Sequence, residues 1–206
     1  MGIFYFHTIR EASEGIFKEK GSKFLAFAFP VSSEEEIRQH QEDLRKKYFD
    51  ARHHCYAWVL GAARDKFRSN DDGEPNHSAG DPILGQIRSH DLTDILIVVV
   101  RYFGGTKLGV SGLIQAYRTA AEEALNNATI IRRELVQAGT LSYPYKSTTE
   151  VQRLIKDYAL QVLDQQFHES CQLNFEIRQH MLELFQEKVE LLKVTGTDVT
   201  LELEKK

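Results

Sequence analysis

The sequence predicts an α+β protein of two domains, and three observations carry that prediction. Apolar residues alternate as in strands in some stretches and recur at helical spacing in others. After about residue 135 the order of these stretches resets to strand, helix, strand, strand, helix, strand, which is the ferredoxin-like order. With 206 residues, 42% of them hydrophobic, the chain can build two small cores. We therefore expect one domain over residues 1–135 and a second over residues 136–206.

The first domain begins with strands. We expect them over residues 4–9 and 17–31, interrupted by turn signals at Glu14-Gly15 and Lys20-Gly21-Ser22. Ser33 and Glu36 form a capping box, which predicts a helix from there to about Tyr48. The pattern after that helix predicts a strand over residues 54–61, a polar loop over residues 64–82, a short helix over residues 83–89 and a strand over residues 95–100.

The stretch from Asp94 to Leu125 organises this domain. Residues 95–100 are an unbroken run of β-branched and leucine side chains, typical of a strand buried on both faces. A glycine-rich turn follows, and helical periodicity begins at Leu113. Amide groups at such a helix start can bind an anion, and nearby cations strengthen the site. We expect a polyanion, and specifically a nucleic acid, to contact Arg101, Gly104, Gly105, Lys107 and Arg118.

The glycine-rich turn matches neither common nucleotide motif. Gly104 and Gly109 have the spacing of a P-loop, but Val110 stands where that motif needs lysine. The dinucleotide pattern is absent as well, so we predict no cofactor. Two alternatives remain open. The glycines serve only a tight turn and close helix packing, or they form a mononucleotide site.

A second candidate site lies in the polar loop. Asp71, Asp72 and Glu74, with His53 upstream, are the residue types of an acid–base or metal site. The spacing fits no EF-hand, and His53 and its neighbour leave a strand by opposite faces, so no metal site is predicted. The other interpretation is a turn closed by side chain–backbone bonds. We carry these four residues as candidates for catalysis while favouring a protein that is not an enzyme.

The second domain repeats a strand and helix alternation. Alternating apolar residues predict strands from Leu141, from Cys171 and from Val199, with a less regular strand over residues 161–168. Ser147 and Glu150 predict a capped helix, and a helix with Leu182 and Phe185 on one face follows. The polar side of the strand after Ser170 carries no aromatic ring for stacking bases, which argues against an RRM. A role in contacting protein, or as a spacer, fits this acidic domain better.

Composition restricts the function classes. The net charge of −4 excludes a protein that is basic overall, so any polyanion contact must be local. Cys55 and Cys171 are far apart and fit unpaired thiols in a reducing compartment. The chain shows no convincing signal peptide and no apolar run long enough for a bilayer. We expect a cytoplasmic protein without membrane contact.

Several motifs resemble the Impact family and its bacterial, YigZ-like branch. They are Ala51 to Trp58, Asn70 to Pro75, Ala79 to Leu84, Val98 to Gly105 with Leu108-Gly109, and Ser22-Lys23-Phe24. The resemblance is close over residues 15–127. It implies a first domain like the second domain of ribosomal protein S5, with helices packed on one face of a sheet. It also implies a ferredoxin-like second domain.

Eukaryotic Impact proteins regulate translation by competing for a protein in a stress-kinase pathway, and they carry a further N-terminal domain. This chain starts almost directly with the shared domain, so that partner is not implied. The segments His77–Gly80 and Lys107–Gly112 also depart from the family pattern. Our leading hypothesis is a translation-associated protein that contacts RNA or the ribosome. The alternatives are a metal-assisted hydrolase that uses the acidic loop and a protein-binding adaptor that uses residues 136–206.

Overall fold

A computed structural model describes residues 2–168 and 170–204 and confirms the α+β class. The chain divides into two compact units. One is Tyr5–Arg133, and the other contains Glu134 and the residues after it, together with residues 2–4. No helix among the described residues is both long and apolar enough to span a membrane.

The first unit is built on a five-stranded antiparallel sheet. Its strands, in spatial order, are β2 (Ser13–Glu19), β3 (Ser22–Pro30), β6 (Ile95–Tyr102), β4 (His53–Leu60) and β5 (Lys66–Asn70). The central strand β6 is buried along nearly its whole length, as its apolar run predicts. Two further strands, β1 (Tyr5–Ile9) and β7 (Ile130–Glu134), pair separately.

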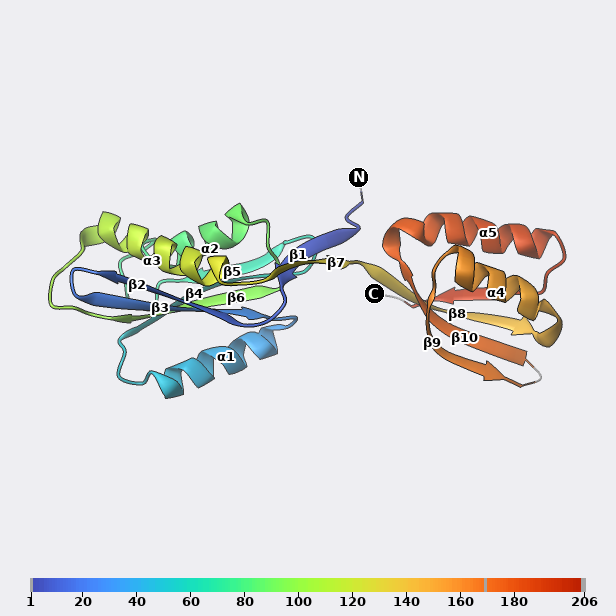
Figure 1. Cartoon of the computed structure of the whole chain (residues 1–206), viewed down its shortest axis with the longest axis horizontal. Coiled ribbons are helices and arrows are strands. Elements are labelled where there is room, and N and C mark those ends of the chain that lie inside the picture. Colours follow the sequence, from blue (N-terminus) through green and yellow to red (C-terminus); the bar gives the residue numbers. More distant parts are fainter. Residues whose placement is uncertain (1, 169, 205–206) are drawn as a thin grey trace. The chain divides into compact units, whose positions relative to one another are not determined.

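Helices cover both faces of this sheet (Figure 1). The helices α2 (Gly80–Ser89) and α3 (Gly109–Asn126) share a core with the small side chains Ala26 and Ala28 of β3. On the other face α1 (Glu34–Lys47) packs against the bulky side chains of the same strand, Leu25 and Phe27. The expectation that helices pack on one face only was therefore wrong. A strand that is apolar on both sides needs cover on both sides.

Three local features of this unit differ from the sequence-based expectations. Gly15 lies inside β2 and marks no turn. Residues 66–70, predicted as loop, form the edge strand β5, which is held by backbone pairing to β4 although its side chains are largely exposed. The helix α3 begins at Gly109, one turn before the apolar periodicity starts at Leu113. The Ser33 cap of α1 is confirmed, because its hydroxyl accepts the amide hydrogen of Glu36.

The second unit has the predicted βαββαβ order. Its elements are β8 (Val136–Pro144), α4 (Thr148–Asp157), β9 (Gln161–Phe167), β10 (Ser170–Arg178), α5 (Leu182–Val194) and β11 (Thr200–Leu203), with single 3₁₀ turns at Tyr145–Ser147 and Gln179–Met181. The strands pair antiparallel in the order β11-β8-β10-β9. Phe175 and Phe185 meet edge to face in its core. The predicted Ser147 cap is wrong, since a 3₁₀ turn leads into α4 and Ser147 makes no side-chain cap bond.

Candidate functional site

The carboxylate of Asp71 closes the acidic loop and holds the start of α2. Its Oδ1 accepts hydrogen bonds from the amides of Ala79 at 2.9 Å and Gly80 at 2.8 Å. Its Oδ2 accepts from the amide of His77 at 2.8 Å. These contacts match the turn interpretation, in which side chains bond to the backbone.

Asp72 is likewise occupied by structural partners. Its carboxylate accepts hydrogen bonds from Arg45 at 2.7 Å and from the amide of His54 at 2.6 Å. The carbonyl oxygen of Asp72 lies 2.9 Å from Nδ1 of His53. The catalytic candidates Asp71, Asp72 and His53 therefore lie near one another, but both carboxylates are engaged by the fold itself.

Glu74, the fourth candidate, points the other way into a buried network. Its Oε1 accepts a hydrogen bond from Nη1 of Arg101 at 2.6 Å and another from the Tyr117 hydroxyl at 2.8 Å. The Arg101 and Glu74 side chains are only 7% and 4% exposed. The pair crosses from the loop to the end of β6, so it ties the loop to the central strand.

Cys55 lies next to this network and is fully buried. Its Sγ lies 3.3 Å from Tyr117 Oη and 3.0 Å from the Asp71 carbonyl oxygen. Burial raises the pKa of the Cys55 thiol, so the thiol stays protonated and is a poor nucleophile. Burial also raises the pKa of Tyr117, which keeps its hydroxyl a donor to Glu74.

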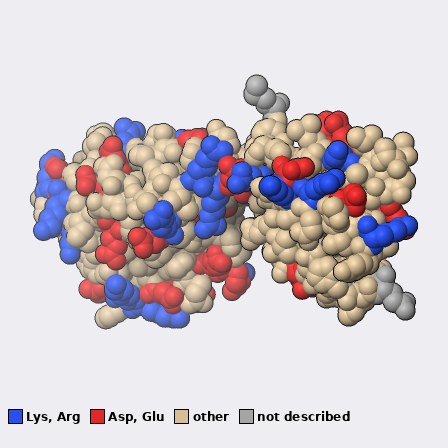
Figure 2. Space-filling model, turned by 45° about the vertical axis from the view of Figure 1, so that its right-hand side comes forward, with Lys and Arg blue, Asp and Glu red and all other residues tan. Residues whose placement is uncertain are grey.

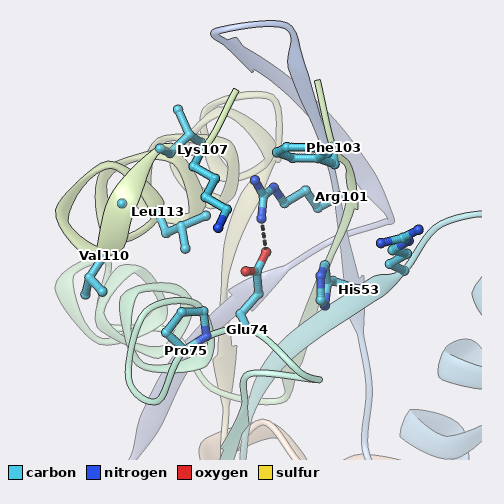
Figure 3. A pocket seen from close by; sticks show the side chains of 11 residues that line it. His53, Glu74, Pro75, Arg101, Phe103, Lys107, Val110 and Leu113 are labelled. Atoms are coloured by element: carbon cyan, nitrogen blue, oxygen red, sulfur yellow. Dashed lines mark hydrogen bonds and ion pairs between the residues drawn. The ribbon is translucent and has the colours of Figure 1, made fainter. Parts of the chain in front are cut away.

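A cavity of about 470 Å³ opens above the Glu74–Arg101 pair (Figure 3). In Figure 3 the side chains of Lys107 and Arg101 point into the same space above Glu74. The lining is largely apolar apart from these charges. The residues around the cavity are Arg52, His53, Glu74, Pro75, Arg101, Phe103, Lys107, Leu108, Gly109, Val110 and Leu113.

The cavity has more cations than anions. Arg52, Arg101 and Lys107 line it, whereas Glu74 is the one carboxylate in its lining. Within the described part of the chain, no acid forms an ion pair with Arg52 or Lys107. Phe103 is 53% exposed at this site, and the Arg101 guanidinium carbon lies 5.7 Å from its ring centroid. On the face that Figure 2 shows, Lys and Arg side chains lie interspersed with Asp and Glu side chains.

The five residues predicted to contact nucleic acid are only partly brought together. Arg101 and Lys107 share the cavity. Arg118 lies outside its lining and borders a separate depression with His77 and Asp81. Arg101 is buried and already paired with Glu74, an ion pair that the spacing of charges along the chain does not reveal.

The two predicted glycines have different roles. Gly104 packs on the β2–β3 turn, where an added Cβ would come within 1.9 Å of the Gly21 carbonyl carbon, and its amide donates to Ser22 Oγ at 3.1 Å. Its N–H is therefore not available to an anion. Gly105 has a φ of +88° and open space around it, so its role in binding stays a prediction.

Arg52 and Phe103 were missing from the predicted site. The antiparallel pairing of β4 with β6 places His53 opposite Arg101, so the residue before β4 and the residue after β6 arrive at the same edge. A prediction of that strand pairing from the two apolar runs would have found them. Among the described residues, no three His, Cys, Asp or Glu side chains form a group that could hold a metal ion.

Comparison with known proteins gives a consistent result. Residues 20–125 match the family model described as the Impact N-terminal domain. The chain is 33% identical over 171 residues to IMPACT family member YvyE of Bacillus subtilis, which covers 83% of this chain and 78% of that protein. It is 37% identical over 138 residues to IMPACT family member YigZ of Escherichia coli, covering 66% and 68%. A crystal structure of a protein described as hypothetical has a TM-score of 0.72 at 26% identity, with both chains covered in full.

Proposed function

The chain belongs to the Impact family, and from that premise we propose that it is a translation-associated regulatory protein that contacts RNA, free or within the ribosome. The contact surface that we propose is the cavity rim, defined as Arg52, Phe103 and Lys107, with Arg101 beneath it. A cytoplasmic location belongs to the same proposal.

One observation carries this proposal. Two cations without acid partners in the described structure and a half-exposed aromatic ring surround a single cavity. Proteins that bind single-stranded RNA combine cations, which track the phosphates, with aromatic side chains, on which bases stack. The cavity rim supplies both kinds of group. Because the net charge of the chain is −4, the attraction for a polyanion must come from the rim itself and not from the protein as a whole.

Co-sedimentation with ribosomes and binding to single-stranded RNA test the proposal. We expect the double variant Arg52→Glu/Lys107→Glu to lower both by at least about tenfold, because two attractive charges become repulsive. The control is Arg118→Glu, which reverses one charge outside the cavity lining and so introduces half of the charge change of the double variant. Unchanged binding by the double variant, or an equal loss in the control, would reject the cavity rim as the contact surface.

A protein-binding adaptor is the second candidate, and it is favoured by the edge strand β9. Among the described strands, β9 pairs with β10 on one side only and is an edge strand of the four-stranded sheet. Leu163 and Phe167 on this strand are 54% and 53% exposed. Edge strands can add a strand from another chain. If this function holds, Leu163→Lys/Phe167→Lys in the full chain abolishes capture of partner proteins, whereas the rim variants leave it unchanged.

A further inference from the structure

We propose that the cavity accepts the terminal phosphate monoester of an RNA strand, with Arg101 as its anchor. This inference rests on the proposed contact with RNA and names which part of the RNA the cavity takes. The anchor is recessed, since the Arg101 side chain is 7% exposed and forms part of the cavity lining.

Arg101 has donors left over after its bond to Glu74. A guanidinium carries five N–H groups in a fixed fork. Nη1 donates to Glu74, whereas the buried Nε finds no partner among the described residues. A buried donor without a partner lowers the stability of the fold, so the unpaired Nε of Arg101 is destabilising. Arg101 lines the cavity, so an acceptor in a ligand there would meet its guanidinium group.

The charge of the cavity favours a monoester over a diester. Glu74 offsets one of the three cations that line the cavity. A terminal phosphate monoester carries about −1.5 to −2 at neutral pH, because its second pKa lies near 6. An internal diester carries a single negative charge. The terminal group therefore matches the remaining positive charge more closely, and its three terminal oxygens offer acceptors to both Arg101 and Lys107.

The shape of the cavity also favours a chain end. Beside the charges its walls are apolar, with Pro75, Val110 and Leu113 among them. An internal nucleotide that reached Arg101 would have to bring the strand both into and out of this recess. A terminal nucleotide enters once, with its phosphate at Arg101 and its base within reach of the exposed Phe103 ring.

The test compares three single-stranded RNAs of one sequence that carry a 5′-phosphate, a 3′-phosphate or no terminal phosphate. The full chain is titrated against each at fixed salt. We expect one of the terminally phosphorylated RNAs to bind about tenfold tighter than the unphosphorylated RNA, as one charge-assisted contact would give. The 5′ and 3′ forms show which end is recognised. A matching mononucleotide should compete with the preferred RNA, whereas a peptide that offers only a terminal carboxylate should not.

Two variants test the charge of the anchor and the space of the cavity separately. Glu74→Gln/Arg101→Gln removes the anchor without leaving a buried charge unpaired, and Val110→Trp fills the cavity from an exposed position without changing any charge. Both should remove the preference for the phosphorylated end, and thermal melting confirms that they fold. Arg118→Gln should keep the preference ratio.

Three results would overturn the inference. Equal binding of all three RNAs would reject end recognition while leaving the proposed RNA contact intact. No binding of any RNA would reject both. A preference that persists in the Val110→Trp variant would place the recognition outside this cavity.

Discussion

Glu74 is the residue on which the floor of the cavity depends. Its Oε1 accepts from both Arg101 and Tyr117, and all three side chains are buried. A buried pair of this kind contributes little net stability relative to an apolar replacement, because desolvating both charges is costly. Removing one partner is strongly destabilising, because the other charge is then left buried without a partner.

We therefore predict that Glu74→Ala destabilises the fold by about 3–5 kcal/mol, because Arg101 loses its carboxylate. Tyr117→Phe should cost about 1 kcal/mol, the net value of one hydrogen bond. Urea denaturation measures both. The control is Glu35→Ala, which removes an ion pair with Arg38 on the exposed side of α1 and should cost less than about 1 kcal/mol. An equal effect of the Glu74 and Glu35 variants would contradict the structural role given to Glu74.

His54 gives the fold a dependence on pH. Its side chain is buried, and neither ring nitrogen has a partner among the described residues. Burial first, and the Arg45 charge second, lower the pKa of His54 below the ordinary value, so the folded chain holds it neutral. The unfolded chain binds this proton more readily. The stability that the neutral ring provides is therefore present above pH 6.5 and is lost as the pH falls toward the folded pKa.

The corresponding variant is His54→Leu. We expect it to flatten the fall in unfolding free energy below about pH 6.5, because the proton uptake on unfolding disappears. His77 acts in the opposite direction, since its hydrogen bond to Asp81 raises the pKa of the imidazole on the surface. Its contribution is present below pH 6.5 and is lost as the pH rises. His77→Gln therefore serves as the control. If the unfolding free energy of His54→Leu still falls with decreasing pH as steeply as that of the wild type, His54 is not the group responsible.

The sequence indicates some residues of the site, but it does not show which of their side chains pair with one another. Arg101 and Lys107 were recognised as cations beside a glycine-rich turn, and both line the cavity. That Arg101 is already paired could not be read from the chain, because Glu74 lies 27 positions away and only the fold brings it close. Asp71 and Glu74 stand three residues apart, yet one carboxylate binds backbone amides and the other binds a guanidinium.

Among the elements, β2 and α3 show how packing overrides a local signal. Gly15 follows Glu14 in a pair that is typical of turns, yet it lies within a strand. A Cβ at this position would come within 2.3 Å of the backbone nitrogen of Ala124, so the glycine permits α3 to lie directly on β2. The Ser13 hydroxyl donates to the Ala124 carbonyl oxygen at 2.8 Å and fixes the same contact. Such close approach depends on a partner over a hundred residues away, which a local pattern cannot show.

We predict that Gly15→Ala destabilises the fold by about 1–3 kcal/mol, because the new methyl group forces β2 and α3 apart. Gly85→Ala is the matched control. Gly85 lies within α2, and nothing is within 4 Å of an added Cβ there. That change should stabilise the fold by about 0.5–1 kcal/mol through helix propensity alone. In thermal denaturation we expect the melting temperature to fall in Gly15→Ala and to rise in Gly85→Ala. A change of the same sign in both variants would contradict the contact between β2 and α3.

At the scale of the whole molecule, each unit contains its own core. Apolar side chains of the first unit gather on both faces of its sheet, and those of the second unit gather between its helices and one sheet face. The reset of the apolar pattern along the chain predicted two units and the βαββαβ order, because each unit repeats a complete set of strands and helices. The placement of α1 on the opposite face of its sheet required three-dimensional information. The alternation of large and small residues in β3 was present in the sequence but does not say which helix covers which face.

The charge of the whole chain leads to the last prediction, which concerns salt. A chain of net charge −4 repels RNA at long range, so binding must come from a few short-range cation–phosphate contacts. If Arg52, Arg101 and Lys107 each contact a phosphate, log K should fall with log salt at a slope of about −2, from about −0.7 per single-stranded contact. Replacing Arg52 and Lys107 by Gln should reduce that slope to about −0.7, whereas Arg118→Gln should leave it near −2. Titrations at several salt concentrations measure the slopes. A wild-type slope near zero would exclude phosphate contacts at this site, because counterion release accompanies every such contact.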